Sequence, residues 1–197
     1  PNSHVRAWAI QLQGDRRKLS AGFFEAVRRL ARHEGHPEVR SQIVGTAFRL
    51  PRDQALPLAA ELLERTRDLD DPFIPLQCWW VLERHCENDR AAVLRLFDNQ
   101  DFFRQPMVEQ HILERLMRRL AARGRQADLA GCARLLARAP TKAPREKVQG
   151  GVSKPNEGQA RTLRPAAFAT QARHPTPPPA CSENLHPSPA PTPSIRR

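Results

Sequence analysis

Apolar residues recur along the first 140 residues at the three- and four-residue spacing of amphipathic helices. The spacing is plainest in the second predicted helix, which carries Phe23, Phe24, Val27, Leu30 and Ala31. Such spacing places the apolar side chains on one face of an α-helix. No segment alternates apolar and polar residues over enough positions to predict a strand. The sequence therefore predicts an all-α fold.

Four of the predicted helices begin with a similar pattern. Aligning their second residues gives separations of 34, 35 and 34 between Val5, Val39, Ile74 and Val108. A regular period of this length is typical of stacked helical hairpins. The Trp-Leu-Gly-Tyr pattern of tetratricopeptide repeats and the Thr-Pro-Leu-His of ankyrin repeats do not occur. We therefore predict a HEAT-like α-solenoid of about four antiparallel helix pairs over residues 1–140.

Proline, aspartate and glycine mark the expected helix ends. Pro37 suits a first helical turn, Pro51 ends the helix that follows, and Asp53 is expected to cap the next one. The fourth pair is predicted at about 105–123 and 126–138. Its expected inward positions are Val108, Ile112, Leu113, Leu116 and Leu120, facing Leu129, Cys132, Leu135 and Leu136.

Proline content divides the chain. Of its 19 prolines, 12 lie from Pro140 onward, and the few apolar residues there are spaced too widely for a core. Such a composition cannot offset the entropy lost on ordering. We predict a weakly ordered extension over 141–170 and a disordered proline-rich tail over 171–197. The PxxP spacings in the tail could serve a proline-recognition domain, although they also arise by chance in so proline-rich a segment.

The formal net charge is +11, and residues 141–197 contribute +6 of it. A basic balance favours nucleic acid or acidic partners. In the helical part, however, arginine is interspersed with glutamate and aspartate, a pattern typical of solvated helix faces. Nucleic acid is therefore disfavoured as a partner. No apolar run approaches the roughly 20 residues that span a bilayer, so no direct membrane insertion is expected.

Trp79 and Trp80 form the most distinctive pair in the sequence. Adjacent helical residues point about 100° apart, so both cannot face one groove. We expect Trp79 to pack between hairpins, and Trp80 either to cap a neighbouring helix or to line the seam between repeats. The alternative is a ligand platform. Trp8 lies at a similar place in the first repeat, which supports a packing role.

The histidines and cysteines resemble metal ligands only loosely. His33 and His36 are three residues apart, and His85 adjoins Cys86 and Glu87. A metal requires three or four converging donors, so loop histidines are the simpler interpretation. Cysteines form no CxxC pair and are expected as buried, unpaired residues where they lie in helices. The four cysteines are Cys78, Cys86, Cys132 and Cys181.

The acidic residues Asp68, Asp70 and Asp71 lack the pattern of a calcium-binding loop, so helix capping explains them. Glu114 and Arg118 form a helical i, i+4 pair. There is no Ser/His/Asp order, glycine-rich phosphate loop or HExxH helix. We predict no catalytic, cofactor-binding or metal-binding residue in this chain.

Residues 71–83 read DPFIPLQCWWVLE. They resemble the D-P-x-x-P-L-x-x-W-W-x-L-E segment of PVC-type haem-binding CxxCH proteins, large bacterial proteins also called membrane-bound dehydrogenases. Residues 4–15 are similar to the V-R-x-W-A-I-R-L-L-G-D that precedes it there, and residues 133–140 resemble the later L-L-x-x-A-P. The resemblance covers about residues 4–140. In that family a propeller precedes the HEAT-like region and a cytochrome c domain closes the chain.

The resemblance implies an exported or membrane-associated redox protein as the parent of this segment. The CxxCH that attaches haem c does not occur here, because Cys181 is followed by Ser and Glu. Haem and dehydrogenase activity are therefore expected in the parent protein and not in this chain. The chain begins at Pro1 and is expected to be a fragment, with a truncated or frameshifted end.

The leading hypothesis is a non-catalytic scaffold or interaction segment. Its partners would be domains of the same parent chain or another protein. The alternative is a stand-alone basic repeat module that binds an acidic protein or nucleic acid, with an affinity that falls as salt rises. A third hypothesis is that the segment completes a dehydrogenase, which haem absorbance would reveal.

Overall fold

The computed structural model describes residues 2–139, 145–146 and 149. Within them the secondary structure is helical and no strand occurs, which confirms the all-α prediction for this part of the chain. The predicted tail over 171–197 lies outside the described residues, as does nearly all of the predicted extension over 141–170.

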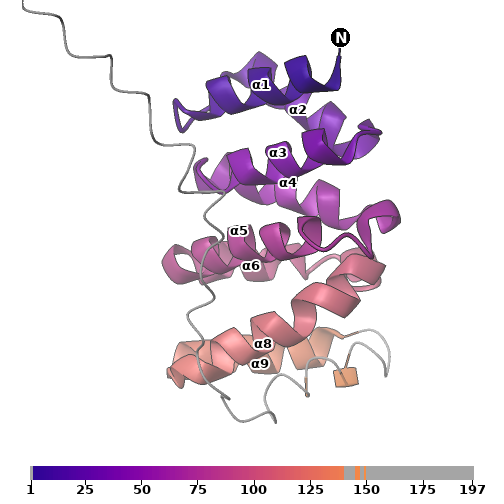
Figure 1. Cartoon of the computed structure of the whole chain (residues 1–197). Helices are drawn as coiled ribbons and strands as arrows, with labels where there is room; N and C mark the ends of the chain where they lie inside the picture. The colour runs from indigo at the N-terminus through magenta and orange to yellow at the C-terminus, as the bar shows by residue number, and fades with distance from the viewer. Residues whose placement is uncertain (1, 140–144, 147–148, 150–197) are drawn as a thin grey trace, which may run out of the picture. The chain divides into compact units, whose positions relative to one another are not determined.

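The longer helices follow one another in pairs, and we call each pair a layer (Figure 1). The layers are α1 (Ser3–Gly14) with α2 (Ala21–His33), α3 (Pro37–Ala47) with α4 (Arg52–Leu63), α5 (Ile74–Asn88) with α6 (Arg90–Leu96), and α8 (Leu113–Arg123) with α9 (Gln126–Arg138). Three short elements lie between them: η1 (Thr66–Asp68), α7 (Gln100–Phe103) and the π-helical turn η2 (Val108–Ile112).

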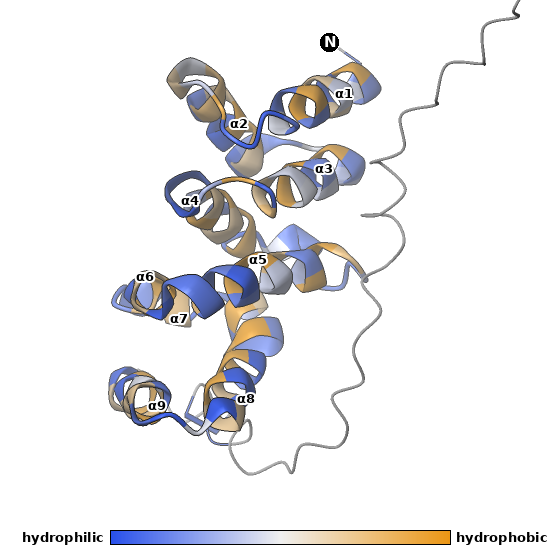
Figure 2. Cartoon of the chain, turned by 90° about the vertical axis from the view of Figure 1, so that its left-hand side faces the viewer, coloured by the Kyte–Doolittle hydropathy of each residue, from blue (hydrophilic) through white to orange (hydrophobic). Residues whose placement is uncertain are grey.

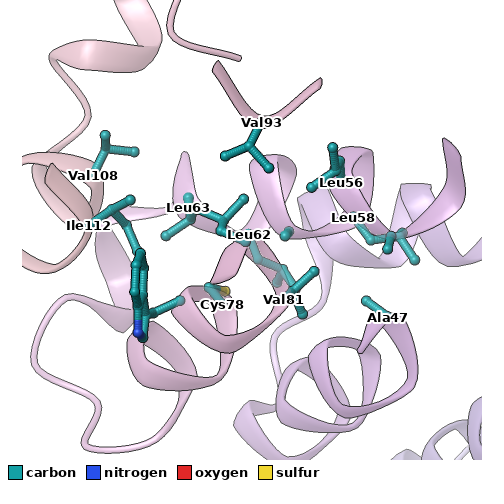
Figure 3. Packing of buried hydrophobic residues seen from close by; sticks show 14 of the residues in the cluster. Ala47, Leu56, Leu58, Leu62, Leu63, Cys78, Val81, Val93, Val108 and Ile112 are labelled. Atoms are coloured by element: carbon teal, nitrogen blue, oxygen red, sulfur yellow. The ribbon is translucent and has the colours of Figure 1, made fainter. Parts of the chain in front are cut away.

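Figure 2 shows the first helix of each layer in one column and the second helix in another. In the first column α1 packs on α3, α3 on α5 and α5 on α8, while in the second column α2 packs on α4. Helix α4 also contacts both α3 and α5, so the layers share a core. Figure 3 shows side chains of successive layers meeting there, among them Leu62, Leu63, Cys78, Val81, Val93, Val108 and Ile112.

Several predicted helix ends are confirmed. Pro37 is the first residue of α3. Asp71 Oδ1 accepts hydrogen bonds from the backbone N–H of Phe73 and of Ile74, both at 2.8 Å, so it satisfies donors at the start of α5. The prediction for Asp53 is wrong, because Pro51 is the N-cap and α4 already begins at Arg52. Asp53 lies instead in the first turn, where its negative charge is favourable.

The fourth pair is close to prediction. The helix expected over 105–123 begins at Pro106, and its residues Val108–Ile112 form the π-helical turn η2 that runs into α8. Pro106 suits the first helical turn, where its missing N–H is tolerated. The break at Gly124 is confirmed, with a left-handed φ of 60°. The inward prediction for Leu129 is wrong, since that side chain is 51% exposed.

The short helix α7 supplies a buried aromatic cluster. The rings of Phe102 and Phe103 each lie edge-on to Phe97, with centroids 5.3 Å apart in both pairs. All three side chains are buried. This cluster lies between the end of α6 and the π-helical turn, which α7 contacts.

Candidate interaction surface

Helix α1 exposes an apolar stripe on the side away from α3. The side chains of Val5, Trp8 and Leu12 are 60%, 60% and 59% exposed. Their spacing of three and four residues puts them on one face of the helix. We call these three residues the outer face of α1. The packing role predicted for Trp8 is wrong, because no described helix lies over this face (Figure 2).

The opposite side of α1 makes a close contact with α3. Ile10 is 1% exposed, and Gly14 lies so near α3 that a Cβ there would come within 2.4 Å of Thr46 Cγ2. Asp15 at the end of α1 pairs with Arg49 at 3.1 Å, and His4 near its start lies 3.7 Å from Glu38. Matching ends are therefore adjacent, and α1 runs parallel to α3.

The outer face of α1 has covered equivalents in the later layers. One period of 34 residues along the chain, the corresponding positions are Val39, Gln42 and Thr46. Val39 and Thr46 are 0% exposed, and Thr46 is the residue that Gly14 approaches. The residues of α3 that correspond to the outer face of α1 therefore lie beneath α1.

The next layer repeats this arrangement. A further 35 residues along, the corresponding positions are Ile74, Gln77 and Val81 in α5. Ile74 and Val81 are buried, and Ser41 of α3 donates a hydrogen bond to Gln77 Oε1 at 3.0 Å. In this alignment Trp8 corresponds to Gln42 and Gln77, and it does not correspond to Trp79. In the first three layers, α1 alone leaves this face uncovered by a described helix.

The exposed positions of α1 carry no Asp, Glu, Lys or Arg side chain. They include Ala9 and Gln13 beside the outer face, whereas Arg6 is only partly exposed and pairs with Glu34. Two other large apolar side chains are exposed among the described residues, Phe73 at 63% and Leu129 at 51%, on different parts of the chain. Single exposed apolar residues are ordinary. A contiguous stripe of three is characteristic of a contact surface.

The double tryptophan contributes to the core. Trp79 is 7% exposed, which confirms its predicted burial. Trp80 is partly buried and packs against the same hydrophobic core. Because Trp79 is inside, the pair presents no exposed platform for a ligand.

Two equivalent ion pairs each join the first helix of a layer to the end of its second helix. Arg6 and Glu34 form a bidentate pair, with Nε–Oε2 and Nη2–Oε1 distances of 2.7 and 2.8 Å. One period later, Arg40 and Asp68 do the same, with Nε–Oδ2 at 2.7 Å. Each arginine is near the start of the first helix in its layer, and each acid follows the second helix. The two helices of these layers are therefore antiparallel.

Other arginines connect one layer to the next. The two partners are 33 to 38 residues apart in the pairs Arg28–Glu61, Arg52–Asp89, Arg90–Asp128 and Arg134–Asp98. The Gln54 side chain makes a similar link, since it accepts a hydrogen bond from Leu19 N and donates one to Leu19 O. Much of the arginine predicted to form solvated helix faces thus pairs across layers. The local pair of Glu114 and Arg118 is also present, at 2.6 Å.

Asp68, Asp70 and Asp71 lie in three different surroundings. Asp71 caps α5 and Asp70 is exposed. Asp68 is 1% exposed and accepts both hydrogen bonds from Arg40. The capping prediction is therefore confirmed for Asp71 and wrong for Asp68, whose partner is far away in the sequence.

The histidines are dispersed. His33 is exposed, and His36 precedes α3, where its N–H donates to Glu34 Oε1 at 2.9 Å. His85 is 6% exposed, and burial lowers the pKa of its imidazole. Its Nε2 has no hydrogen-bond partner among the described residues. These positions do not converge on one point, and the described residues contain no group of three or more His, Cys, Asp or Glu that could hold a metal ion.

The cysteines of the described region are unpaired and buried, namely Cys78, Cys86 and Cys132. Burial raises the pKa of the Cys78 thiol and of the Cys86 thiol. Both side chains therefore stay protonated at neutral pH, and a protonated thiol is a poor nucleophile. Cys181 lies outside the described residues.

Comparison of the chain with protein-family models, with curated proteins and with solved structures finds no match. Within the part of the chain that the structure describes, no helix combines the length and the apolar character needed to cross a membrane.

Proposed function

We propose that residues 1–140 form a HEAT-like α-solenoid that acts as a non-catalytic scaffold or interaction segment. The observation that carries this proposal is the equivalence of the ion pairs Arg6–Glu34 and Arg40–Asp68. Each pair joins the two helices of its layer, and the two pairs lie one period apart. Repeated layers that contact their neighbours build an extended surface, and such surfaces commonly join or space other domains.

The chemistry of the described side chains supports a structural role. The thiols of Cys78 and Cys86 are buried, and burial raises the pKa of each. The His85 imidazole is buried, and burial lowers its pKa. The arginines and acidic residues are used largely to hold layers together. These groups serve packing, whereas a catalytic site requires reactive groups that converge on a substrate.

We further propose that the segment belongs to a multidomain membrane-associated dehydrogenase or cytochrome-c-type protein, exported from the cytoplasm. The resemblance of residues 71–83 to that family supports this assignment. Its partners would then be domains of the same chain or another protein. Any haem c would be held outside this segment, which carries no CxxCH.

A basic module that binds an acidic partner is the second candidate. Arg16, Arg17 and Lys18 are exposed in the turn between α1 and α2, and no ion pair involves them within the described residues. This cluster is small, and many other arginines are already paired across layers. The basic charge therefore supports the scaffold more strongly than it supports a binding site.

A scaffold of this kind should hold its ends at a fixed distance. We would attach a donor and an acceptor fluorophore at Asn2 and Arg138 of the full chain and measure single-molecule energy transfer. We expect one narrow population that keeps its position as urea is raised toward the unfolding transition. A label pair at Asn2 and His33, within one layer, controls for local unfolding. Broad or continuously shifting end-to-end distances, with a constant signal from the control pair, would overturn the scaffold.

A further inference from the structure

We propose that the outer face of α1 (Val5, Trp8 and Leu12) is the contact surface between two copies of this chain, which meet α1 against α1. The inference rests on the proposed function in one respect, since it treats the layers as structural repeats. It adds the site of contact, the partner and the residues that determine the contact.

The first step is that this face of the repeat binds a helix. In α3 the equivalent residues Val39 and Thr46 are fully buried beneath α1. In α5 the equivalent Gln77 accepts a hydrogen bond from α3. The outer face of α1 has the same position in its layer and is more apolar, because Trp8 and Leu12 replace Gln42 and Thr46. An apolar face that stays exposed in solution is characteristic of a contact surface.

The second step is that another α1 has the matching chemistry. The covering surface must be helical, apolar and uncharged, because a charge buried against Trp8 would lose its hydration. Among the described residues, α1 is the only helix with more than one exposed large apolar side chain. Its exposed positions carry no Asp, Glu, Lys or Arg, so two chains of net charge +11 can meet there without like charges in the contact.

The stripe is also self-complementary. Trp8 lies near its centre, with Val5 three residues before and Leu12 four residues after. A twofold axis beside Trp8 would set two α1 helices antiparallel, with Val5 of one copy opposite Leu12 of the second copy. Each copy then uses the same patch, as a twofold contact requires.

The contact is small. Twelve helical residues extend about 18 Å, so the buried area falls below that of a standard protein interface. We therefore expect a weak dimer, with a dissociation constant on the order of 10–100 µM.

Analytical ultracentrifugation of the full chain over about 5–500 µM tests the proposal, a range set by that affinity. The mass should rise from 22.3 kDa toward twice that value. Trp8→Gln combined with Leu12→Thr installs the residues that α3 has at these positions, so α1 should remain helical. This variant should raise the dissociation constant at least tenfold. Phe73→Gln combined with Leu129→Gln is the matched control, and it should dimerise like the unsubstituted chain.

A charge-pairing experiment tests the antiparallel arrangement. Chains carrying Val5→Lys or Leu12→Glu should each be monomeric, whereas an equimolar mixture should associate because Lys and Glu face each other. Circular dichroism and thermal midpoints would establish that every variant is folded.

An unsubstituted chain that stays monomeric over the whole range overturns the proposal, and the outer face of α1 then has another occupant. Equal dimerisation of the Trp8/Leu12 variant overturns it as well, since another surface must then be responsible. A mixture that remains monomeric overturns the antiparallel contact. None of these outcomes alters the end-to-end distance expected of the scaffold, so the two proposals fail separately.

Discussion

Arg40 and Asp68 form the most deeply buried ion pair in the described part of the chain, with side chains 3% and 2% exposed. Beyond the carboxylate, the guanidinium donates to the backbone oxygens of Glu34 and Gly35, at 3.2 and 2.8 Å. A buried charge without its partner loses hydration and gains nothing in return. Removing either residue of the pair should therefore destabilise the fold.

Asp68→Ala should lower the free energy of unfolding by about 3–5 kcal/mol, because it leaves the Arg40 guanidinium buried and unpaired. The control is Asp15→Ala, which removes an exposed pair with Arg49 and should cost less than about 1 kcal/mol. Urea unfolding monitored by circular dichroism measures both. Equal losses in the two variants would show that burial does not determine the strength of these pairs.

This pair also marks what a single sequence can tell about individual residues. The interspersed charges predicted solvated helix faces, and the local pair Glu114–Arg118 was found as predicted. The pairing of Arg40 could not be predicted, because the carboxylate of its partner Asp68 lies 28 residues away in another element and not at the i, i+4 position. Pairing of this kind depends on how the layers fold together.

Among the helices, the contact of α1 with α3 depends on the lack of a side chain at Gly14. The atoms nearest to a Cβ built there are Thr46 Cγ2 at 2.4 Å, Thr46 Oγ1 at 3.1 Å and Arg49 Nη2 at 3.2 Å. The shortest of these distances leaves no room for a methyl group, and the other two are tight. A larger residue must push α1 away from α3 or force the Thr46 side chain to move.

Gly14→Ala should therefore lower the free energy of unfolding by about 1–3 kcal/mol. Adding Thr46→Ser removes the obstructing methyl group and keeps the hydroxyl that Gln42 contacts at 3.1 Å, so it should restore part of the loss. Gly22→Ala in α2 is the control: nothing lies within 4 Å of its built Cβ, and better helix propensity should stabilise the chain by up to about 1 kcal/mol. If the Ser substitution restores nothing, the steric explanation is wrong.

Helix positions were largely predictable, whereas the irregular elements were not. Pro37, Gly124 and the apolar spacing located most boundaries within a few residues. The π-helical turn η2 and the short helix α7 have no periodic signature, and α7 is held by burial of Phe102 and Phe103 against Phe97. Pro106 gave no signal of the π-helical turn, because it lies in the first helical turn, where proline is tolerated.

At the scale of the whole molecule, the uncovered face of α1 could not be foreseen. The apolar spacing in α1 and α3 predicts a buried stripe in both, and it contains no information on which helix has a neighbour. Trp8 was accordingly expected to pack, and it is 60% exposed. Only the order of the layers in space shows which of the described helices has no described neighbour on this face.

That order predicts a gradient of local stability. Helix α5 contacts α3, α4, α6, α8 and the π-helical turn, whereas α1 is packed chiefly on α3. In a stack of repeats, elements with neighbours on one side open at lower free energy than those with neighbours on both. We expect amide hydrogen exchange, measured by mass spectrometry on dilute protein, to be at least about 100-fold slower in α5 than in α1.

The dependence of amide hydrogen exchange on protein concentration tests the proposed dimer. If α1 meets α1 in a dimer, raising the protein concentration should slow exchange in α1 and leave α5 unchanged, because only the outer face gains a neighbour. The Trp8→Gln, Leu12→Thr variant should lose this concentration dependence and keep the gradient seen in dilute protein. Uniform protection across all layers would contradict the proposed repeat architecture, since the described helices would then open as one cooperative unit. If the gradient of exchange rates does not change with protein concentration, the result supports the layers and contradicts the proposed dimer.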